Sequence, residues 1–160
     1  MNEIIAAKLR EKFGDKVLSV NEYRGELTVV VAKRSIVDVA AFLRDDAELT
    51  FDSIRDVCGA DYYRPDDRYE VVYNVYSMKN NFRVRIKVRV DEKDLKVATV
   101  SGVWPGANWM EREAYDMYGI VFEGHPDPRR MYMPEDFEYF PLRKDFPLMG
   151  IPGSLTLPRK

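Results

Sequence analysis

The 160-residue sequence contains one cysteine, Cys58, and one histidine, His125. A lone thiol excludes an internal disulfide framework and is typical of a reducing compartment. An iron–sulfur cluster generally takes four thiolates, or two thiolates and two imidazoles, so this chain cannot hold a cluster alone. His125 likewise has no second histidine or cysteine with which to form a metal site.

Two glycine motifs and two kinds of apolar segment are also missing. The sequence has neither G-x-G-x-x-G nor G-x-x-x-x-G-K-S/T, so we expect no nucleotide, flavin or other cofactor in this chain. No apolar run approaches the roughly 20 residues that span a bilayer, and the N-terminus lacks a signal-peptide core. We therefore expect a soluble, cytoplasmic chain that reaches a membrane only through partners.

Charge of one sign is not in excess. The 25 basic and 27 acidic residues give a net charge of −2, which provides no global attraction to nucleic acid or anionic lipid. A chain of this length is sufficient for one compact domain with a hydrophobic core.

Two helices are predicted near the N-terminus. The first covers residues 2–13, where apolar residues recur at helical spacing, and Gly14 ends it. The second begins at Ser35, with Asp38 in its first turn. Their buried stripes are predicted to be Ile5, Leu9 and Phe13 in the first helix and Ile36, Val39, Ala40 and Leu43 in the second.

Strands are predicted where the apolar period becomes two. Gly59 indicates a bulge within one of them, and Asn80-Asn81 closes a long hairpin. The predicted strands cover residues 16–20, 26–32, 51–62, 68–78 and 82–90, with a further short apolar segment at 98–103. In the hairpin, the predicted core-facing pairs are Val75 with Ile86, Tyr73 with Val88 and Val71 with Val90.

The opposite face of the hairpin carries a row of cations. These residues could form a nucleic-acid stripe, a docking face for an acidic partner, or a solvated surface braced by cation–π contact with Tyr76. We favour the solvated or locally paired surface, because the glycines and stacking aromatics of a nucleic-acid site are absent. The row consists of Arg83, Arg85, Lys87 and Arg89.

A third helix is predicted over residues 109–118. Asn108 would cap it, Glu111 would complete a capping box, and Gly119 would end it in the left-handed conformation. Three consecutive charges lie about 100° apart around such a helix, so at least one must point into the protein. They are Glu111, Arg112 and Glu113, and the predicted apolar stripe is Met110, Ala114 and Met117.

The order of these elements predicts an α+β fold, a two-layer domain with a mostly antiparallel mixed sheet and helices on one face. This compact domain would span residues 1–119. Residues 120–160 would form an extended, proline-rich C-terminal docking tail, because seven of the nine prolines follow Gly119. The tail is too apolar for disorder in water, so either its own domain or, beyond Pro134, a partner must bury it.

Two landmarks in this region resemble a known family. Glu111-Arg112-Glu113, Asp116-Met117-Tyr118, His125 and residues 129–132 resemble the signature of the 30 kDa subunit family of respiratory complex I, whose bacterial members are the C subunits of NADH-quinone oxidoreductases. Residues 141–147 resemble the second landmark of that family, although Tyr139-Phe140 stands where members often have Gly-His. The residues that this resemblance assigns to the signature and a partner interface are Glu111, Arg112, Glu113, Asp116, His125, Arg129, Arg130, Pro141, Leu142, Arg143, Lys144 and Asp145.

The resemblance implies a non-catalytic structural subunit of the hydrophilic arm of a proton-translocating NADH:quinone oxidoreductase. Its partners would be the large quinone-site subunit of the 49 kDa type and cluster-bearing neighbours, which would carry the FMN and iron–sulfur clusters. It would lie peripherally on the cytoplasmic side of the inner membrane, without inserting and without nucleic acid. An alternative is the equivalent subunit of a related membrane-bound hydrogenase or coenzyme-linked dehydrogenase.

The charged residues also allow other interpretations. Glu111, Glu113 and Asp116 could serve a small hydrolase, but carboxylates flanking an arginine on one helix are more often structural ion pairs. His125 is interpreted as a hydrogen-bonded turn residue. The cation pairs at 129–130 and 143–144 could bind phosphate, but no glycine nest accompanies them, so pairing with a partner's carboxylates is preferred.

Overall fold

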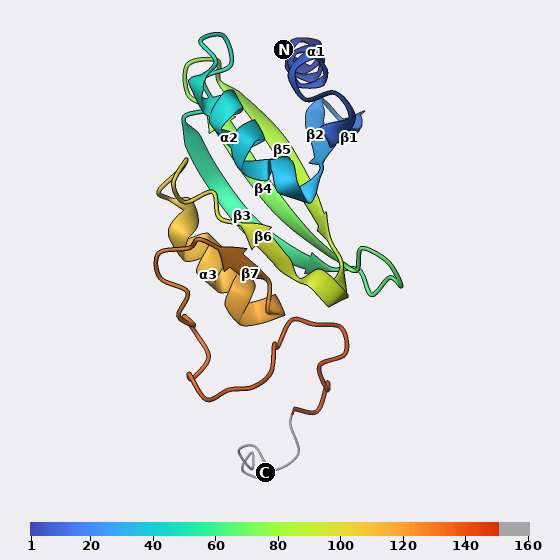
Figure 1. The fold of residues 1–160 in the computed structure, drawn as a ribbon, viewed down its shortest axis with the longest axis vertical. Helices are drawn as coiled ribbons and strands as arrows, with labels where there is room; N and C mark the ends of the chain where they lie inside the picture. The colour runs from blue at the N-terminus through green and yellow to red at the C-terminus, as the bar shows by residue number, and fades with distance from the viewer. Residues whose placement is uncertain (151–160) are drawn as a thin grey trace.

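A computed structural model of the chain describes residues 1–150 (Figure 1). The last ten residues of the predicted tail, 151–160, lie outside the described residues. Short 3-10 turns connect several of the elements. The helices are α1 (Asn2–Phe13), α2 (Ile36–Asp45) and α3 (Ala107–Tyr118), and the strands are β1 (Val17–Tyr23), β2 (Glu26–Val31), β3 (Ser53–Asp61), β4 (Tyr69–Ser77), β5 (Phe82–Val90), β6 (Lys96–Ala98) and β7 (Val121–Glu123).

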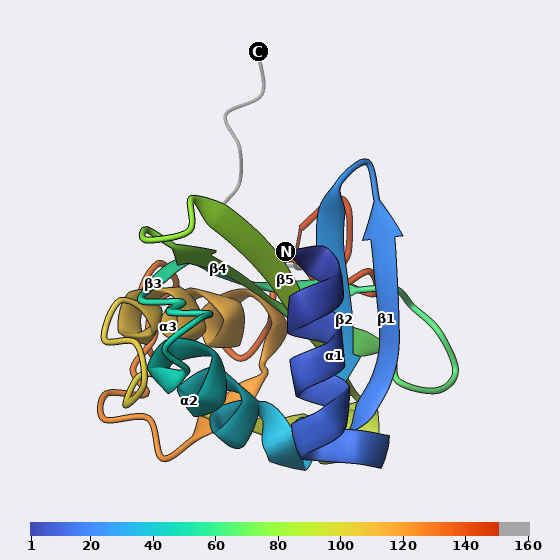
Figure 2. The same cartoon turned by 90° about the horizontal axis from the view of Figure 1, so that it is seen from above.

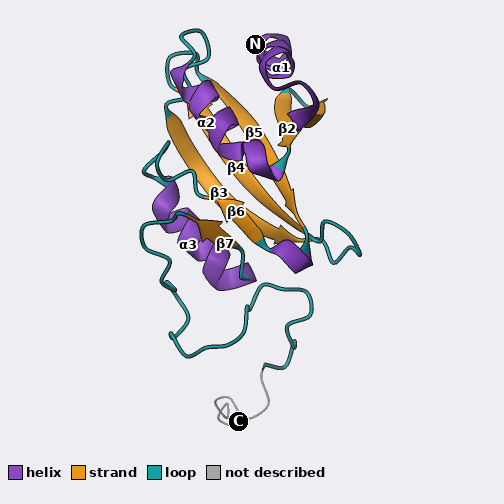
Figure 3. Cartoon of the chain, viewed as in Figure 1, coloured by secondary structure: helices purple, strands orange, loops and turns teal. Residues whose placement is uncertain are grey.

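Five of these strands form one sheet in the order β1-β2-β5-β4-β3. β2 and β5 run parallel, whereas the other neighbours are antiparallel. The helices lie together on one face of the sheet, as the view from above shows (Figure 2), and loops make up most of the chain after α3 (Figure 3). The predicted α+β fold, with a mostly antiparallel mixed sheet and helices on one face, is confirmed.

The core lies between the sheet and these helices. Every residue of the two predicted N-terminal stripes is buried, from Ile5 in α1 to Leu43 in α2. Gly14, with φ of 54°, ends α1 as predicted. The local apolar period was a sufficient signal here because each helix buries one continuous stripe.

The predicted hairpin register was wrong by two residues. Val75 pairs with Val84 and Tyr73 with Ile86, because Met78–Asn81 form a four-residue turn between Ser77 and Phe82. A shift of two residues leaves each side chain on the same face of a strand, so the core face was assigned correctly.

The predicted position of the bulge in β3 was also wrong. It lies between Ile54 and Asp56, whereas Gly59 pairs regularly with Val71. Gly59 instead allows a close approach from α3, because a Cβ atom there would lie 2.5 Å from the ring of Tyr118. The absent side chain serves helix–sheet packing and not a bulge.

The apolar segment predicted at 98–103 divides into two structures. β6 ends at Ala98 and pairs in parallel with β7, while the following residues turn towards α3. Ile120 and Phe122 are buried in the core, so compact structure continues past the boundary predicted at Gly119. Among residues 1–150, no helix is long and apolar enough to cross a membrane.

Candidate functional site: helix α3 and the C-terminal ribbon

The signature residues lie on α3 and on residues 124–150, which we call the C-terminal ribbon. The predicted capping box was wrong: α3 begins at Ala107, Gly106 is its N-cap, and no side chain caps it. Glu111 points inward instead, where the hydroxyl of Thr99 and the backbone N–H of Val100 donate to it. Gly119 ends the helix in the left-handed conformation, with φ of 78°, as predicted.

Glu111 is fully buried. Its Oε1 atom accepts a hydrogen bond from the backbone N–H of Val100 at 2.8 Å, and its Oε2 atom accepts one from the hydroxyl of Thr99. Burial raises the pKa of Glu111 to about 7, although these two hydrogen bonds act in the opposite direction. The carboxyl group therefore joins α3 to the segment after β6, and it titrates near neutral pH.

His125 is the hydrogen-bonded turn residue that the sequence predicted. The backbone N–H of Asp127 donates to its Nδ1 atom at 3.0 Å, so Nδ1 is an acceptor and the proton of the neutral ring is on Nε2. Nε2 then donates to the carbonyl oxygen of Asn108, also at 3.0 Å. The ring thus links the start of α3 to the start of the ribbon, 3.8 Å from Glu111 Oε2.

Arg112 is the second buried charge on α3. Its guanidinium group donates to the carbonyl oxygens of Arg129 and Arg130, at 3.0 and 3.2 Å, and lies 3.3 Å from the carboxylate of Asp127. This arginine therefore binds backbone carbonyls of the ribbon that have no strand partner. The sequence-based expectation that a charge of this triplet points into the protein is confirmed.

Asp116 accepts hydrogen bonds from backbone N–H groups of the ribbon, as Arg112 donates to its carbonyl oxygens. Its Oδ2 atom accepts from Met131, Tyr132 and Met133 at 3.0, 2.6 and 3.0 Å, and its Oδ1 atom lies 2.7 Å from the guanidinium group of Arg130. Burial tends to raise the pKa of this carboxyl group, but the four donors bring it below its ordinary value.

Arg130 extends the same network further along the ribbon. Its guanidinium group donates to the carbonyl oxygens of Phe137 and Tyr139 at 2.5 and 3.3 Å, and it lies 5.0 Å from the ring centre of Phe140. The adjacent Arg129 is exposed and pairs with Asp127 on the surface at 2.7 Å. Arg130 therefore holds the ribbon in place, whereas Arg129 forms only a surface ion pair.

Gly119 provides the place where the ribbon crosses the end of α3. A Cβ atom on Gly119 would lie 2.5 Å from the guanidinium group of Arg143 and 2.7 Å from the ring of Phe140. Arg143 Nε donates to the carbonyl oxygen of Tyr118 at 2.7 Å. A glycine is required here both for its positive φ and for this close approach.

A buried ion pair fixes the far end of the ribbon. Asp61, at the end of β3, lies 2.7 Å from Arg68, and it accepts a hydrogen bond from the backbone N–H of Lys144 at 2.8 Å. Arg68 also lies 3.1 Å from Asp145 and 2.8 Å from Glu92. Burial opposes ionisation of Asp61, but the hydrogen bonds, chiefly from Arg68, lower its pKa to about 2.

Sequence reasoning missed both Asp61 and Arg68. The available signal was an aspartate inside a strand pattern, where this residue is depleted. Of the predicted site residues, the structure gathers Arg112, Asp116 and Arg130 into one network. Glu113 is exposed on α3, and Leu142 is exposed on the ribbon.

The three carboxylates considered for a hydrolase do not converge. Glu111 faces Val100, Asp116 faces the ribbon, and Glu113 faces solvent. Within residues 1–150 there is no cluster of three or more histidine, cysteine or acidic side chains that could hold a metal ion. The arrangement is an anchoring network that holds an extended segment against its own domain.

Comparisons with known proteins identify the family of this chain. Residues 29–152 match the family described as "Respiratory-chain NADH dehydrogenase, 30 Kd subunit". The C subunit of the NADH-quinone oxidoreductase of Geotalea uraniireducens is 50% identical over 149 residues, which cover 93% of this chain and 90% of that protein. The corresponding C subunit of a Roseiflexus species is 49% identical over 92% of this chain and 84% of its own length.

Solved structures share the fold. The trypsin-resistant fragment (1-134) of Nqo5 aligns with a TM-score of 0.68 and 32% identity, covering 79% of this chain and 99% of the fragment. A chain of an archaeal membrane-bound sulfane sulfur reductase aligns with a TM-score of 0.78 at 22% identity, covering 92% and 86% of the two chains, which shows a shared fold alone. The present chain belongs to the family of the respiratory-chain NADH dehydrogenase 30 kDa subunit.

Proposed function

We propose that this chain is a non-catalytic structural subunit in the peripheral, hydrophilic arm of a proton-translocating NADH:quinone oxidoreductase. It docks on the large quinone-site subunit of the 49 kDa type and touches cluster-bearing neighbours. The FMN and iron–sulfur clusters belong to those partner subunits. The chain reaches the cytoplasmic side of the inner membrane only through them.

The observation that carries this proposal is the surface of the ribbon. Leu148 and Met149 are 100% and 96% exposed, and Leu142 is 51% exposed. Leu148 and Met149 are neighbours in the sequence, and exposed apolar side chains that lie together are unfavourable in water and mark a protein contact. Tyr132 and Tyr139 on the same ribbon are also exposed, and tyrosine is common at protein interfaces.

The anchoring network gives this surface a defined shape before any partner arrives. Asp116, Arg112 and Arg130 satisfy backbone groups of the ribbon that would otherwise be free to move. A segment that is already ordered loses less conformational entropy on binding than a flexible one. Arg112, Asp116 and Arg130 thus act by positioning the apolar contacts and need not touch the partner themselves.

The names of the relatives favour this function over a role in a hydrogenase. Those at about 50% identity are NADH-quinone oxidoreductase subunits, whereas the sulfane sulfur reductase chain shares the fold at 22% identity. Glu111, Glu113 and Asp116 point in three different directions and share no cleft, which argues against a hydrolase.

Co-purification tests the proposal. The double substitution Leu142→Asp and Leu148→Asp should leave the circular dichroism spectrum and the melting temperature unchanged, because both side chains are exposed. It should abolish recovery of the large subunit with the tagged chain. Leu18→Asp is the matched control, because Leu18 is 55% exposed on β1, away from the ribbon. Full recovery of the complex with the double variant would contradict the proposal.

A further inference from the structure

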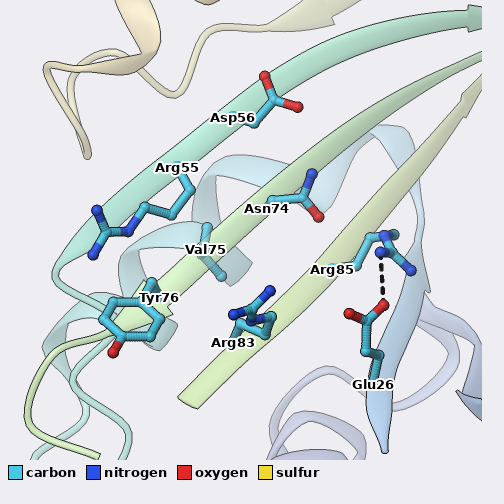
Figure 4. A pocket seen from close by; sticks show the side chains of 8 residues that line it. All are labelled: Glu26, Arg55, Asp56, Asn74, Val75, Tyr76, Arg83 and Arg85. Carbon is cyan, nitrogen blue, oxygen red and sulfur yellow. Dashed lines mark hydrogen bonds and ion pairs between the residues drawn. The ribbon is translucent and has the colours of Figure 1, made fainter. Parts of the chain in front are cut away.

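The outer face of the sheet is the part of the molecule that the ribbon and the helices leave uncovered. The helices lie on the opposite face (Figures 1 and 2). On the outer face, β3, β4 and β5 surround a hollow of about 530 Å³ (Figure 4). Its lining residues are Glu26, Arg55, Asp56, Asn74, Val75, Tyr76, Arg83 and Arg85.

In one half of this face the cations form ion pairs with a carboxylate of the same chain. The carboxylate of Glu70 is buried, and it lies 2.9 Å from Lys87, 3.1 Å from Arg64 and 3.9 Å from Arg89. Burial acts to raise the pKa of Glu70, but Lys87 and Arg64 bring it below its ordinary value. The predicted cation row is thus paired locally in this half, and its cations have no need of an outside partner.

The hollow lies in the other half, where the balance differs. Three guanidinium groups line it together with two carboxylates, and Glu26 is engaged by Arg85 at 2.9 Å. Within residues 1–150, Arg55 and Arg83 form no ion pair. Arg55 stacks on the ring of Tyr76, with 4.6 Å between the guanidinium carbon and the ring centre. The guanidinium groups of Arg55 and Arg83, which we call the two arginine forks, are therefore available to bind an incoming group.

The strand register sets the geometry of these forks. Tyr76 on β4 pairs with Arg83 on β5 and with Ser53 at the start of β3; Arg55 follows two residues later, in the register shift between Ile54 and Asp56. Arg55 and Arg83 therefore flank β4 at roughly 10 Å, twice the distance between neighbouring strands. Tyr76 holds one fork in place from between them, and Asn74 adds amide groups to the floor of the hollow (Figure 4).

We infer that this hollow is a docking site for an acidic segment of a partner protein, which places two carboxylates on Arg55 and Arg83. Arginine forks bind carboxylates through paired N–H···O hydrogen bonds, and stacking on tyrosine pre-organises one of them. The last ten residues of this chain do not fit as the occupant, because residues 151–160 contain Arg159 and Lys160 and no acid. The inference rests on the proposed function, since it requires the chain to be held in an assembly.

Zero-length cross-linking in the intact assembly tests this site. Arg83→Lys introduces an amine that carbodiimide can join to a carboxylate in direct contact. Mass spectrometry should find position 83 joined to an aspartate or glutamate of another polypeptide. The control is Arg24→Lys, because Arg24 is an exposed arginine stacked over Tyr23 outside the hollow, and it should give no such product.

Removal of both forks provides a second measurement. Arg55→Gln with Arg83→Gln should weaken retention of the identified partner by roughly tenfold or more and reduce its salt dependence, whereas Arg24→Gln should not. Once the partner's carboxylates are known, Arg83→Glu combined with a lysine in their place should restore binding.

The outcomes separate the two proposals. If the chain remains in the assembly but position 83 joins only Asp56, Glu26 or a second copy of the chain, or nothing, the acidic-segment inference is wrong. If the unmodified chain fails to co-purify with the large subunit, the proposed function falls and the inference falls with it.

Discussion

The backbone N–H of Lys144 lies 2.8 Å from Oδ2 of Asp61, although 83 residues separate the two along the chain. This contact, together with the ion pair between Asp61 and Arg68, fixes the ribbon at the end of β3. Both side chains are almost completely buried. The ribbon is thus held at its start by α3 and near its end by the sheet.

Arg68→Met should destabilise the domain strongly, because it leaves the carboxylate of Asp61 buried beside no cation. Loss of one partner of a buried ion pair typically costs about 3–5 kcal/mol. Urea denaturation should show this decrease in the free energy of unfolding. Arg129→Met removes an exposed arginine paired with Asp127 and should change the midpoint little. Equal midpoints for both variants would show that the Asp61 pair is not structural.

The same pair should make the domain sensitive to acid. Because the pKa of Asp61 is lowered to about 2 in the folded chain, its contribution is complete above the ordinary pKa of 3.8 and is lost as the pH falls towards 2. Asp61→Asn should be less stable than the unaltered chain at pH 6, and the difference should shrink by pH 2. A difference that stays constant over this range would exclude ionisation of Asp61 as its cause.

Glu111 should produce the opposite pH dependence. Its folded-state pKa is raised to about 7, so the folded chain binds the proton more tightly than the unfolded chain. The contribution of Glu111 to stability is greatest below its ordinary pKa of 4.5 and declines up to pH 7, by up to about 3 kcal/mol. Glu111→Gln should remove this decline, because an amide keeps the hydrogen-bonding shape without titrating. Thermal melts of both chains at pH 5 and pH 8 measure the difference.

Asp116→Asn should release the ribbon from α3 while the sheet remains folded. The substitution removes the charge that three N–H groups and Arg130 share, and we expect a local loss of about 2–4 kcal/mol. Hydrogen exchange at residues 131–133 should accelerate, whereas exchange in β4 and β5 should not. Asp136→Asn, at an exposed position of the ribbon, is the control.

Gly119→Ala tests the crossing point of the ribbon. A left-handed conformation costs an alanine about 1–2 kcal/mol, and the added methyl group must also displace Phe140 or Arg143. The melting temperature should fall, and the variant should recover less of the large subunit. Gly102→Ala provides the matched change, because a Cβ atom at Gly102 meets nothing within 4 Å. The crossing has no structural importance if the two substitutions behave alike.

Local patterns were informative where one element buries one face. The stripes of α1 and α2, the core face of the hairpin and the left-handed Gly119 each depend on neighbours within a few residues, and each was predicted correctly. The prediction of the hairpin register was wrong because the register depends on the geometry of the turn, which Asn80-Asn81 alone does not define.

The sequence by itself determined the family, the fold class and the presence of a charged helix followed by an apolar ribbon. Apolar periodicity and the order of residues can be read from the chain alone, so predictions based on them stay correct even when a strand register is predicted wrongly. Only the tertiary structure decided what each charge does. It placed Glu111 against Val100 instead of at a helix cap, and Asp116 against the ribbon. Such choices depend on which donors a folded interior brings within 3 Å, and the partners involved are far apart in the sequence.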